Sequence, residues 1–141
     1  MPMRKGSAEW KGNFAEGTGT VVSESGALRG AYSASSRFEA GQGTNPEELI
    51  ASAHAACFSM ALAAGLTGAG HAPQSVKTEA QVHIEKGEGG WSITRIDLKT
   101  EARVPGITEA AFQEQAGLAK KSCPISRALA AVPIHLEAHL V

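Results

Sequence analysis

The chain has 141 residues, 43% of them apolar, which fits one compact domain with a buried core. Its 13 lysines and arginines nearly balance its 14 aspartates and glutamates, so the formal net charge of −1 indicates neither nucleic acid nor an anionic membrane as a partner. The longest apolar stretch, residues 55–66, is too short to span a bilayer, and no signal-peptide core follows the N-terminus, so we expect a cytoplasmic protein.

Residues 1–45 are rich in glycine and serine and carry weak strand signals. Residues 8–11 and 19–22 are expected as short strands separated by turns. The glycines in this segment fit turns better than a phosphate cradle, because no lysine-bearing phosphate loop follows them. The segment has too little apolar surface to fold alone, so we expect it to pack on something else, such as a second subunit.

A long helix is predicted over residues 46–66. Asn45 suits the N-cap, Pro46 suits the first helical position, and Glu47 and Glu48 favour the positive end of the helix dipole. Glu48 also has the spacing of a capping box. Apolar or small residues recur at helical spacing and predict one buried face, made of Leu49, Ile50, Ala53, Cys57, Met60 and Ala64.

The remaining elements follow from alternation and helical spacing. Residues 76–85 and 95–104 are expected as a hairpin, with a bulge or bend near Thr94 because the apolar parity changes there. A second helix begins at Thr108 and ends near Cys123, before a short helix over 124–131 and a last strand over 134–140. The predicted fold class is α+β, an antiparallel sheet packed on two long helices, with residues 1–141 forming a single domain.

The two cysteines are the residues with the clearest chemical potential. Cys57 and Cys123 are 66 positions apart, which excludes a short redox or zinc motif. Burial in mid-helix should raise the pKa of Cys57, so a reactive Cys57 needs a cation nearby. Cys123 is expected at a helix junction, where free backbone N–H groups favour its thiolate. If both helices face one core, the two sulfurs converge; otherwise they are two small buried hydrophobes.

The chain resembles a known family along its whole length. The motifs that carry the resemblance are Phe38-Glu39, residues 43–50 (GTNPEELI), residues 54–62 (HAACFSMAL), residues 104–107 (VPGI) and residues 123–126 (CPIS). Through these motifs the chain is similar to the OsmC/Ohr family of osmotically inducible and organic hydroperoxide resistance proteins, and closer to the OsmC branch than to its sister.

The resemblance implies catalytic roles that the residues alone do not give. It implies that Cys57 attacks a peroxide, and that the resulting sulfenic acid condenses with Cys123 to an intramolecular disulfide. It assigns the missing cation to Arg37, held by the carboxylate of Glu47. It also implies an intertwined homodimer, no metal, haem or flavin cofactor, and a dithiol reductant, for which the family suggests a lipoyl type.

Each of these roles has an alternative. Arg37 could be a solvated loop cation, and Glu47 could serve only the helix dipole. His54 lies one helical turn before Cys57 and could act as the base of a cysteine hydrolase, although packing or a backbone hydrogen bond is the favoured role. His135 and His139 would lie about 13 Å apart on a strand, so they do not indicate a metal site.

The sequence therefore predicts a cysteine-based peroxidase that reduces organic hydroperoxides in oxidative or osmotic stress defence. The rival interpretation is a non-catalytic thiol redox sensor or binding protein. An organic substrate is favoured over hydrogen peroxide because apolar side chains lie near the two helix stripes. The candidates for that lining are Ile50, Phe58, Met60 and Phe112.

Overall fold

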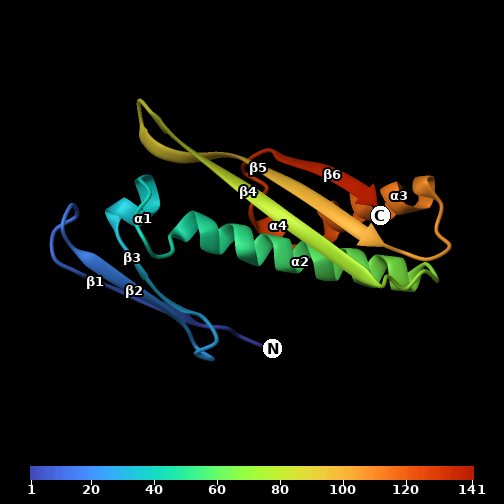
Figure 1. Ribbon diagram of the computed structural model, residues 1–141, viewed down its shortest axis with the longest axis horizontal. Helices are drawn as coiled ribbons and strands as arrows, with labels where there is room; N and C mark the ends of the chain where they lie inside the picture. The colour runs from blue at the N-terminus through green and yellow to red at the C-terminus, as the bar shows by residue number, and fades with distance from the viewer. The chain divides into compact units, whose positions relative to one another are not determined.

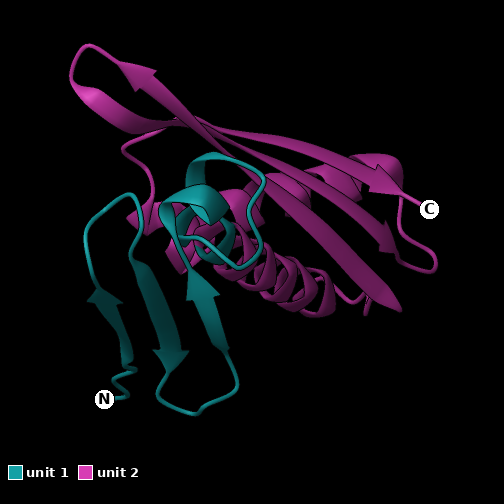
Figure 2. Ribbon diagram, turned by 60° about the vertical axis from the view of Figure 1, so that its left-hand side comes forward, with its two compact units in different colours: residues 1–49 teal, residues 50–141 magenta.

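The computed structural model describes all 141 residues of the chain (Figure 1). It divides into two compact units, residues 1–49 and residues 50–141, drawn in teal and magenta in Figure 2. Each unit has its own three-stranded sheet.

The N-terminal unit holds an antiparallel sheet in the order β1-β2-β3. The two predicted strands are confirmed as β1 (Gly6–Lys11) and β2 (Thr18–Ser23). Strand β3 (Arg29–Tyr32) and helix α1 (Ala34–Phe38) were not predicted. Both are too short to show a sequence period, and α1 depends on a local capping box in which Ser33 and Ser36 each bind the other's backbone N–H.

Helix α2 (Pro46–Gly68) begins where its capping residues predict. The Asn45 side-chain oxygen accepts a hydrogen bond from the Glu48 backbone N–H at 2.8 Å. The Asn45 amide also donates to the Ser36 carbonyl at 3.0 Å, which joins the start of α2 to α1. Asn45 therefore fixes both the helix start and the end of the preceding loop.

Replacing Asn45 with alanine is expected to lower the free energy of unfolding by about 1 kcal/mol, the usual cost of a lost N-cap. Asn45→Asp keeps the capping acceptor and loses only the amide donor, which binds the Ser36 carbonyl and, at 3.5 Å, the Glu48 carboxylate. Its loss of stability should therefore be smaller. Chemical denaturation of the two variants checks this. Equal losses would show that the amide donor, and not the cap, carries the effect.

The buried face of α2 differs from the predicted one. The fully buried residues are His54, Phe58, Leu62 and Leu66, whereas Cys57 is half-buried. Ala53, Met60 and Ala64 were predicted to be buried but are exposed, and Met60 is 74% exposed. The prediction was wrong because α2 carries apolar or small residues on nearly every face, so spacing alone does not identify the buried one.

Residues 55–66 were expected to be too short to span a bilayer, but helix α2 as a whole, 23 residues, is long and apolar enough in composition to cross a membrane. Only 22% of its most apolar window is buried within the chain. One apolar face of α2 is therefore exposed to solvent within the chain. It is formed by Ala53, Ala56, Met60 and Ala64.

The C-terminal unit holds a sheet in the order β4-β5-β6. Strands β4 (Ser75–Gly87) and β5 (Gly90–Arg103) form the predicted hairpin. His83 pairs with Arg95 and Ile84 pairs with Ile93, so Thr94 has no cross-strand partner. The bulge predicted at Thr94 is confirmed.

Strand β6 (Ile134–Leu140) pairs with β5 in parallel, so this sheet is mixed and not fully antiparallel. The chain leaves β5 and returns to β6 through helices α3 (Glu109–Ser122) and α4 (Pro124–Ala128). A crossover of this kind returns the chain in its original direction, which produces a parallel pair. Alternation within a strand carries no information on that direction.

One apolar cluster joins the helices to the sheet in the C-terminal unit, and Figure 1 shows α2 running along the sheet. Helix α4 is shorter than predicted and ends at Ala128. The predicted α+β fold class is confirmed. The side chains that fill the cluster include Phe58, Leu62 and Leu66 from α2, Ile96, Leu98 and Ala102 from β5, and Phe112, Ala116 and Ala119 from α3.

Candidate active site

Two thiols meet inside the C-terminal unit. The sulfur of Cys57, in the middle of α2, lies 3.0 Å from the sulfur of Cys123, at the junction of α3 and α4. Both thiols are free. A disulfide bond is about 2.05 Å long, so a small side-chain movement is enough to bond these sulfurs. The convergence expected from two helices that face one core is confirmed.

Cys123 is fully buried and caps α4, because Pro124 occupies the first helical position. Its sulfur lies 3.5 Å from the Ser126 backbone nitrogen. Burial by itself acts to raise the pKa of Cys123. Hydrogen-bond contacts of its sulfur with Cys57, with Ser126 and with the Ile125 backbone outweigh burial and lower that pKa below the ordinary thiol value.

Cys57 shows the opposite behaviour. Burial and the hydrogen bond with Cys123 raise the pKa of Cys57, and only the Ile125 backbone N–H acts against them. Within the C-terminal unit, more hydrogen-bond donors therefore favour the thiolate of Cys123 than that of Cys57. Cys57 needs an additional positive charge to ionise near neutral pH.

The N-terminal unit holds an arginine–carboxylate pair. An Arg37 Nη2 donates to Glu47 Oε1 at 2.6 Å, and Arg37 Nε lies 3.1 and 3.2 Å from the two carboxylate oxygens. This bidentate pair joins α1 to the first turn of α2. The hydrogen bond from Glu47 raises the pKa of Arg37 above its already high ordinary value, so the guanidinium is a permanent cation.

Glu47 is only 7% exposed, whereas the Arg37 side chain is 36% exposed. The guanidinium thus keeps donors that Glu47 does not use. Glu47 does more than face the helix dipole, because both its oxygens accept hydrogen bonds from Arg37. The four predicted site residues therefore form two pairs, Cys57–Cys123 in one unit and Arg37–Glu47 in the other.

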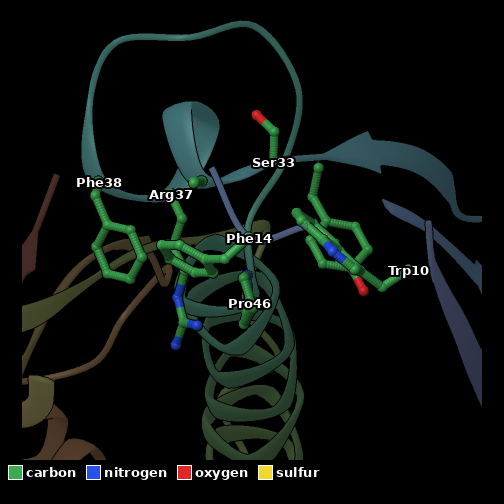
Figure 3. Close-up of a pocket in the computed structure, with 8 residues that line it drawn as sticks. Trp10, Phe14, Ser33, Arg37, Phe38 and Pro46 are labelled. Atoms are coloured by element: carbon green, nitrogen blue, oxygen red, sulfur yellow. The ribbon is translucent and has the colours of Figure 1, made fainter. Parts of the chain in front are cut away.

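A cavity of about 270 Å³ opens beside Arg37 in the N-terminal unit (Figure 3). Two aromatic pairs form much of its wall: Trp10 and Tyr32 have ring centroids 5.5 Å apart, and Phe14 and Phe38 have theirs 6.3 Å apart. The Arg37 guanidinium carbon lies 5.1 Å from the Phe38 ring centroid. The cavity is therefore apolar with one cationic edge.

The predicted lining residues do not belong to this cavity. Phe58 and Phe112 are fully buried in the core, and Met60 is exposed on α2. Ile50 is half-buried. The cavity walls come instead from residues 10–46, where single aromatic side chains lie among turn residues without a sequence period.

His54 is fully buried, and its Nε2 lies 2.6 Å from the Ser126 hydroxyl oxygen. Its Nδ1 is buried and has no hydrogen-bond partner. Neither ring nitrogen binds Cys57, which argues against a His54-assisted cysteine hydrolase. The favoured packing role holds, although the hydrogen bond goes to a side chain and not to the backbone. Sequence reasoning did not identify Ser126 as a site residue. Its position three residues after Cys123, the N-cap of α4, could have indicated that it lies beside that sulfur.

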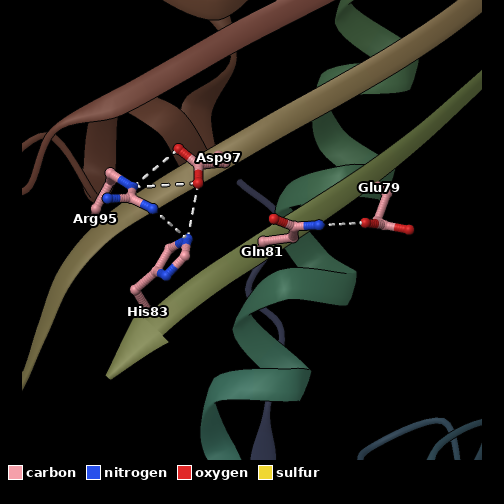
Figure 4. A network of polar contacts seen from close by, with 5 residues as sticks. All are labelled: Glu79, Gln81, His83, Arg95 and Asp97. Carbon is pink, nitrogen blue, oxygen red and sulfur yellow. Dashed lines mark hydrogen bonds and ion pairs between the residues drawn. The ribbon is translucent and has the colours of Figure 1, made fainter. Parts of the chain in front are cut away.

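A second polar cluster lies on the β4–β5 hairpin (Figure 4). His83 Nε2 is 2.8 Å from Asp97 Oδ2 and 3.1 Å from an Arg95 Nη2. Hydrogen bonds from His83 and Arg95 outweigh the effect of desolvation and lower the pKa of Asp97. His83 and Arg95 are also cross-strand partners beside the bulge, so the cluster supports the strand register.

No group of three or more histidine, cysteine, aspartate or glutamate side chains is arranged to hold a metal ion. His139 Nε2 lies 3.0 Å from Glu137 Oε1 on the exposed side of β6. His135 and His139 lie on that same strand, as expected.

Comparisons with known proteins point to one family. The family model described as OsmC-like protein matches residues 39–137. The chain is 49% identical over 129 residues to peroxiredoxin OsmC of Escherichia coli strain K12, covering 91% of this chain and 90% of that protein. It is 35% identical over 89 residues to an organic hydroperoxide resistance protein of Xanthomonas axonopodis pv. citri, covering 62% and 61% of the two chains.

Solved structures agree with the fold. The organic hydroperoxide resistance protein OhrB of Bacillus subtilis superposes with a TM-score of 0.72 at 26% identity, over 97% of this chain and 98% of that one. An OsmC-like protein from Mycoplasma pneumoniae superposes with a TM-score of 0.79 at 16% identity, over 99% and 98%. The second match supports the fold alone.

Proposed function

We propose that this chain, which belongs to the OsmC-like protein family, reduces organic hydroperoxides with Cys57 as the attacking thiol and Cys123 as the resolving thiol. Its curated relatives support thiol-dependent peroxidase activity and a role in stress defence. The observation that carries the two-cysteine mechanism is the 3.0 Å separation of the sulfurs.

The proposed cycle has two chemical steps. The Cys57 thiolate attacks the terminal peroxide oxygen, the O–O bond breaks, and the alkoxide takes a proton and leaves as an alcohol. Cys57 is then a sulfenic acid. The Cys123 sulfur attacks the Cys57 sulfur, the S–OH bond breaks, and the departing hydroxide leaves as water with the proton released by Cys123.

Arg37 has two roles in this proposal. Its charge stabilises the Cys57 thiolate, which burial and Cys123 disfavour, and its free N–H donors stabilise the alkoxide as it leaves. Glu47 holds the guanidinium in one orientation through the bidentate pair. The proposal requires that a folded assembly bring an Arg37 guanidinium to the Cys57 sulfur.

An intertwined homodimer supplies such an assembly. The apolar face of α2 formed by Ala53, Ala56, Met60 and Ala64 is exposed within one chain. A second copy that covers this face would also give the N-terminal segment a surface on which to pack. The single-domain organisation expected for residues 1–141 is then a property of the dimer.

The aromatic cavity beside Arg37 favours an organic substituent on the peroxide. Trp10, Phe14, Tyr32 and Phe38 offer apolar surface that a cumyl or similar group can cover, whereas hydrogen peroxide has almost none to bury. The proposed reductant is a dithiol of the lipoyl type, and a reducing cytoplasm would return both cysteines to thiols after each cycle.

Steady-state turnover tests the proposal. The protein should consume many equivalents of cumene hydroperoxide in the presence of excess dihydrolipoamide, and it should act more slowly on hydrogen peroxide. Peroxide loss and dithiol oxidation, followed together, should stay equimolar through repeated cycles. A single oxidation of each chain without further consumption would instead favour the thiol redox sensor.

A further inference from the structure

The C-terminal unit buries a histidine and a serine for which the peroxidase cycle has no role so far. His54 is 0% exposed and Ser126 is 4% exposed, and they join α2 to α4 through the 2.6 Å contact between Nε2 and Oγ. Ser126 also lies beside the resolving thiol, because its backbone nitrogen is 3.5 Å from the Cys123 sulfur.

The direction of the histidine contact follows from its other nitrogen. His54 Nδ1 is buried with no hydrogen-bond partner. A proton on Nδ1 would be a buried donor with nothing to bind, which native proteins avoid more strictly than a bare acceptor. Burial also lowers the pKa of His54, so the ring carries one proton. That proton therefore lies on Nε2, and His54 donates to Ser126 Oγ.

This direction leaves the Ser126 hydroxyl proton free for another acceptor. The Cys123 sulfur is the candidate acceptor, because it lies 3.5 Å from the backbone nitrogen of the same serine. Interaction with the Ser126 side chain also acts to lower the pKa of Cys123. The inferred chain therefore runs from His54, which donates to Ser126, to the Cys123 sulfur. The geometry does not fit a serine hydrolase, because Ser126 is buried and no carboxylate holds Nδ1.

We propose that Ser126, oriented by His54, is a positioning residue that stabilises the Cys123 sulfur as an anion during disulfide formation. The inference rests on the proposed two-cysteine cycle. The Cys123 proton passes to the departing hydroxide, the S–S bond forms as the S–O bond of the sulfenic acid breaks, and the Ser126 hydroxyl keeps its proton throughout. Its hydrogen bond is strongest when Cys123 carries the negative charge.

Ser126→Ala tests this role with little loss of volume. A single addition of peroxide should oxidise Cys57 at the wild-type rate, whereas disulfide formation should slow by about tenfold, the usual effect of losing one hydrogen bond to a charged group. Quenched samples, analysed by mass spectrometry for sulfenic acid and disulfide, separate the two steps. The variant should also overoxidise at lower peroxide concentrations.

His54 is tested by a pair of variants. His54→Gln can place an amide N–H at the position of Nε2 and should keep much of the rate of disulfide formation. His54→Leu should lower that rate as much as Ser126→Ala does. Thr100→Val is the matched control, because Thr100 is equally buried but binds Thr78 on the sheet. It should change stability and leave the disulfide rate unchanged.

A measurement without peroxide separates this inference from the proposed function. In a Cys57→Ser background, the pKa of Cys123 followed by thiolate absorbance should rise when Ser126 becomes alanine. An unchanged pKa together with a wild-type disulfide rate would overturn the role of Ser126. Failure of the wild-type protein to oxidise Cys57 would instead overturn the peroxidase cycle, while the pKa comparison would still decide whether Ser126 acts on Cys123.

Discussion

Cys57→Ser is expected to abolish consumption of organic hydroperoxide above the background rate of the dithiol. A serine hydroxyl is almost never ionised near neutral pH, so the nucleophile of the first step is lost. Cys123→Ser should retain the first attack and lose the disulfide, so that Cys57 progresses to sulfinic and sulfonic acid. Single-turnover peroxide assays and intact-mass measurement of the two variants check this difference.

These two variants also test which cysteine has which role, because hydrogen bonds favour the Cys123 thiolate whereas burial disfavours the Cys57 thiolate. If Cys123→Ser stopped peroxide consumption while Cys57→Ser preserved it, the attacking and resolving roles would be exchanged. In the wild-type protein, one equivalent of peroxide per chain should produce an internal crosslink between residues 57 and 123. Its absence would contradict the two-cysteine cycle under either assignment.

Local signals predicted much of the fold. Asn45 and Pro46 locate the start of α2 because capping is decided within one turn of chain. The parity change around Thr94 locates the bulge, because alternation records which face each residue takes. Pro124 ends one helix and opens the next, which places Cys123 at a cap.

Features set by tertiary packing could not be predicted in this way. The direction of β6 depends on the path of the crossover and not on the residues of the strand. The buried face of α2 is determined by what packs against it, since Phe58 and Met60 are both apolar but only Phe58 lies in the core.

The candidate site also has one part that the sequence pattern suggested and one part that it did not. The approach of the two sulfurs follows from two helices that share one core, which spacing suggests without giving a distance. Arg37 and Glu47 are separated in sequence by a loop, and only the family resemblance indicated that they pair. The pairing depends on α1, a five-residue helix with no sequence period of its own.

Arg37→Gln is expected to raise the pKa of Cys57 and to lower the rate of peroxide attack at neutral pH by about 10²- to 10³-fold. Burial already favours the neutral Cys57 thiol, so without the guanidinium the thiolate fraction falls further. Because the rate rises with pH as the thiolate forms, the whole profile should shift toward alkaline pH. Stopped-flow measurement of peroxide attack across pH gives both quantities.

A matched pair of variants separates this electrostatic role from stability. Arg37→Gln alone leaves the buried Glu47 carboxylate without its partner, which destabilises the fold and could itself reduce activity. Adding Glu47→Gln removes that charge and should restore stability but not the rate. Arg37→Lys keeps the charge, loses the bidentate geometry and should be intermediate. If the double variant recovered wild-type attack, Arg37 would hold Glu47 in place and would not activate Cys57.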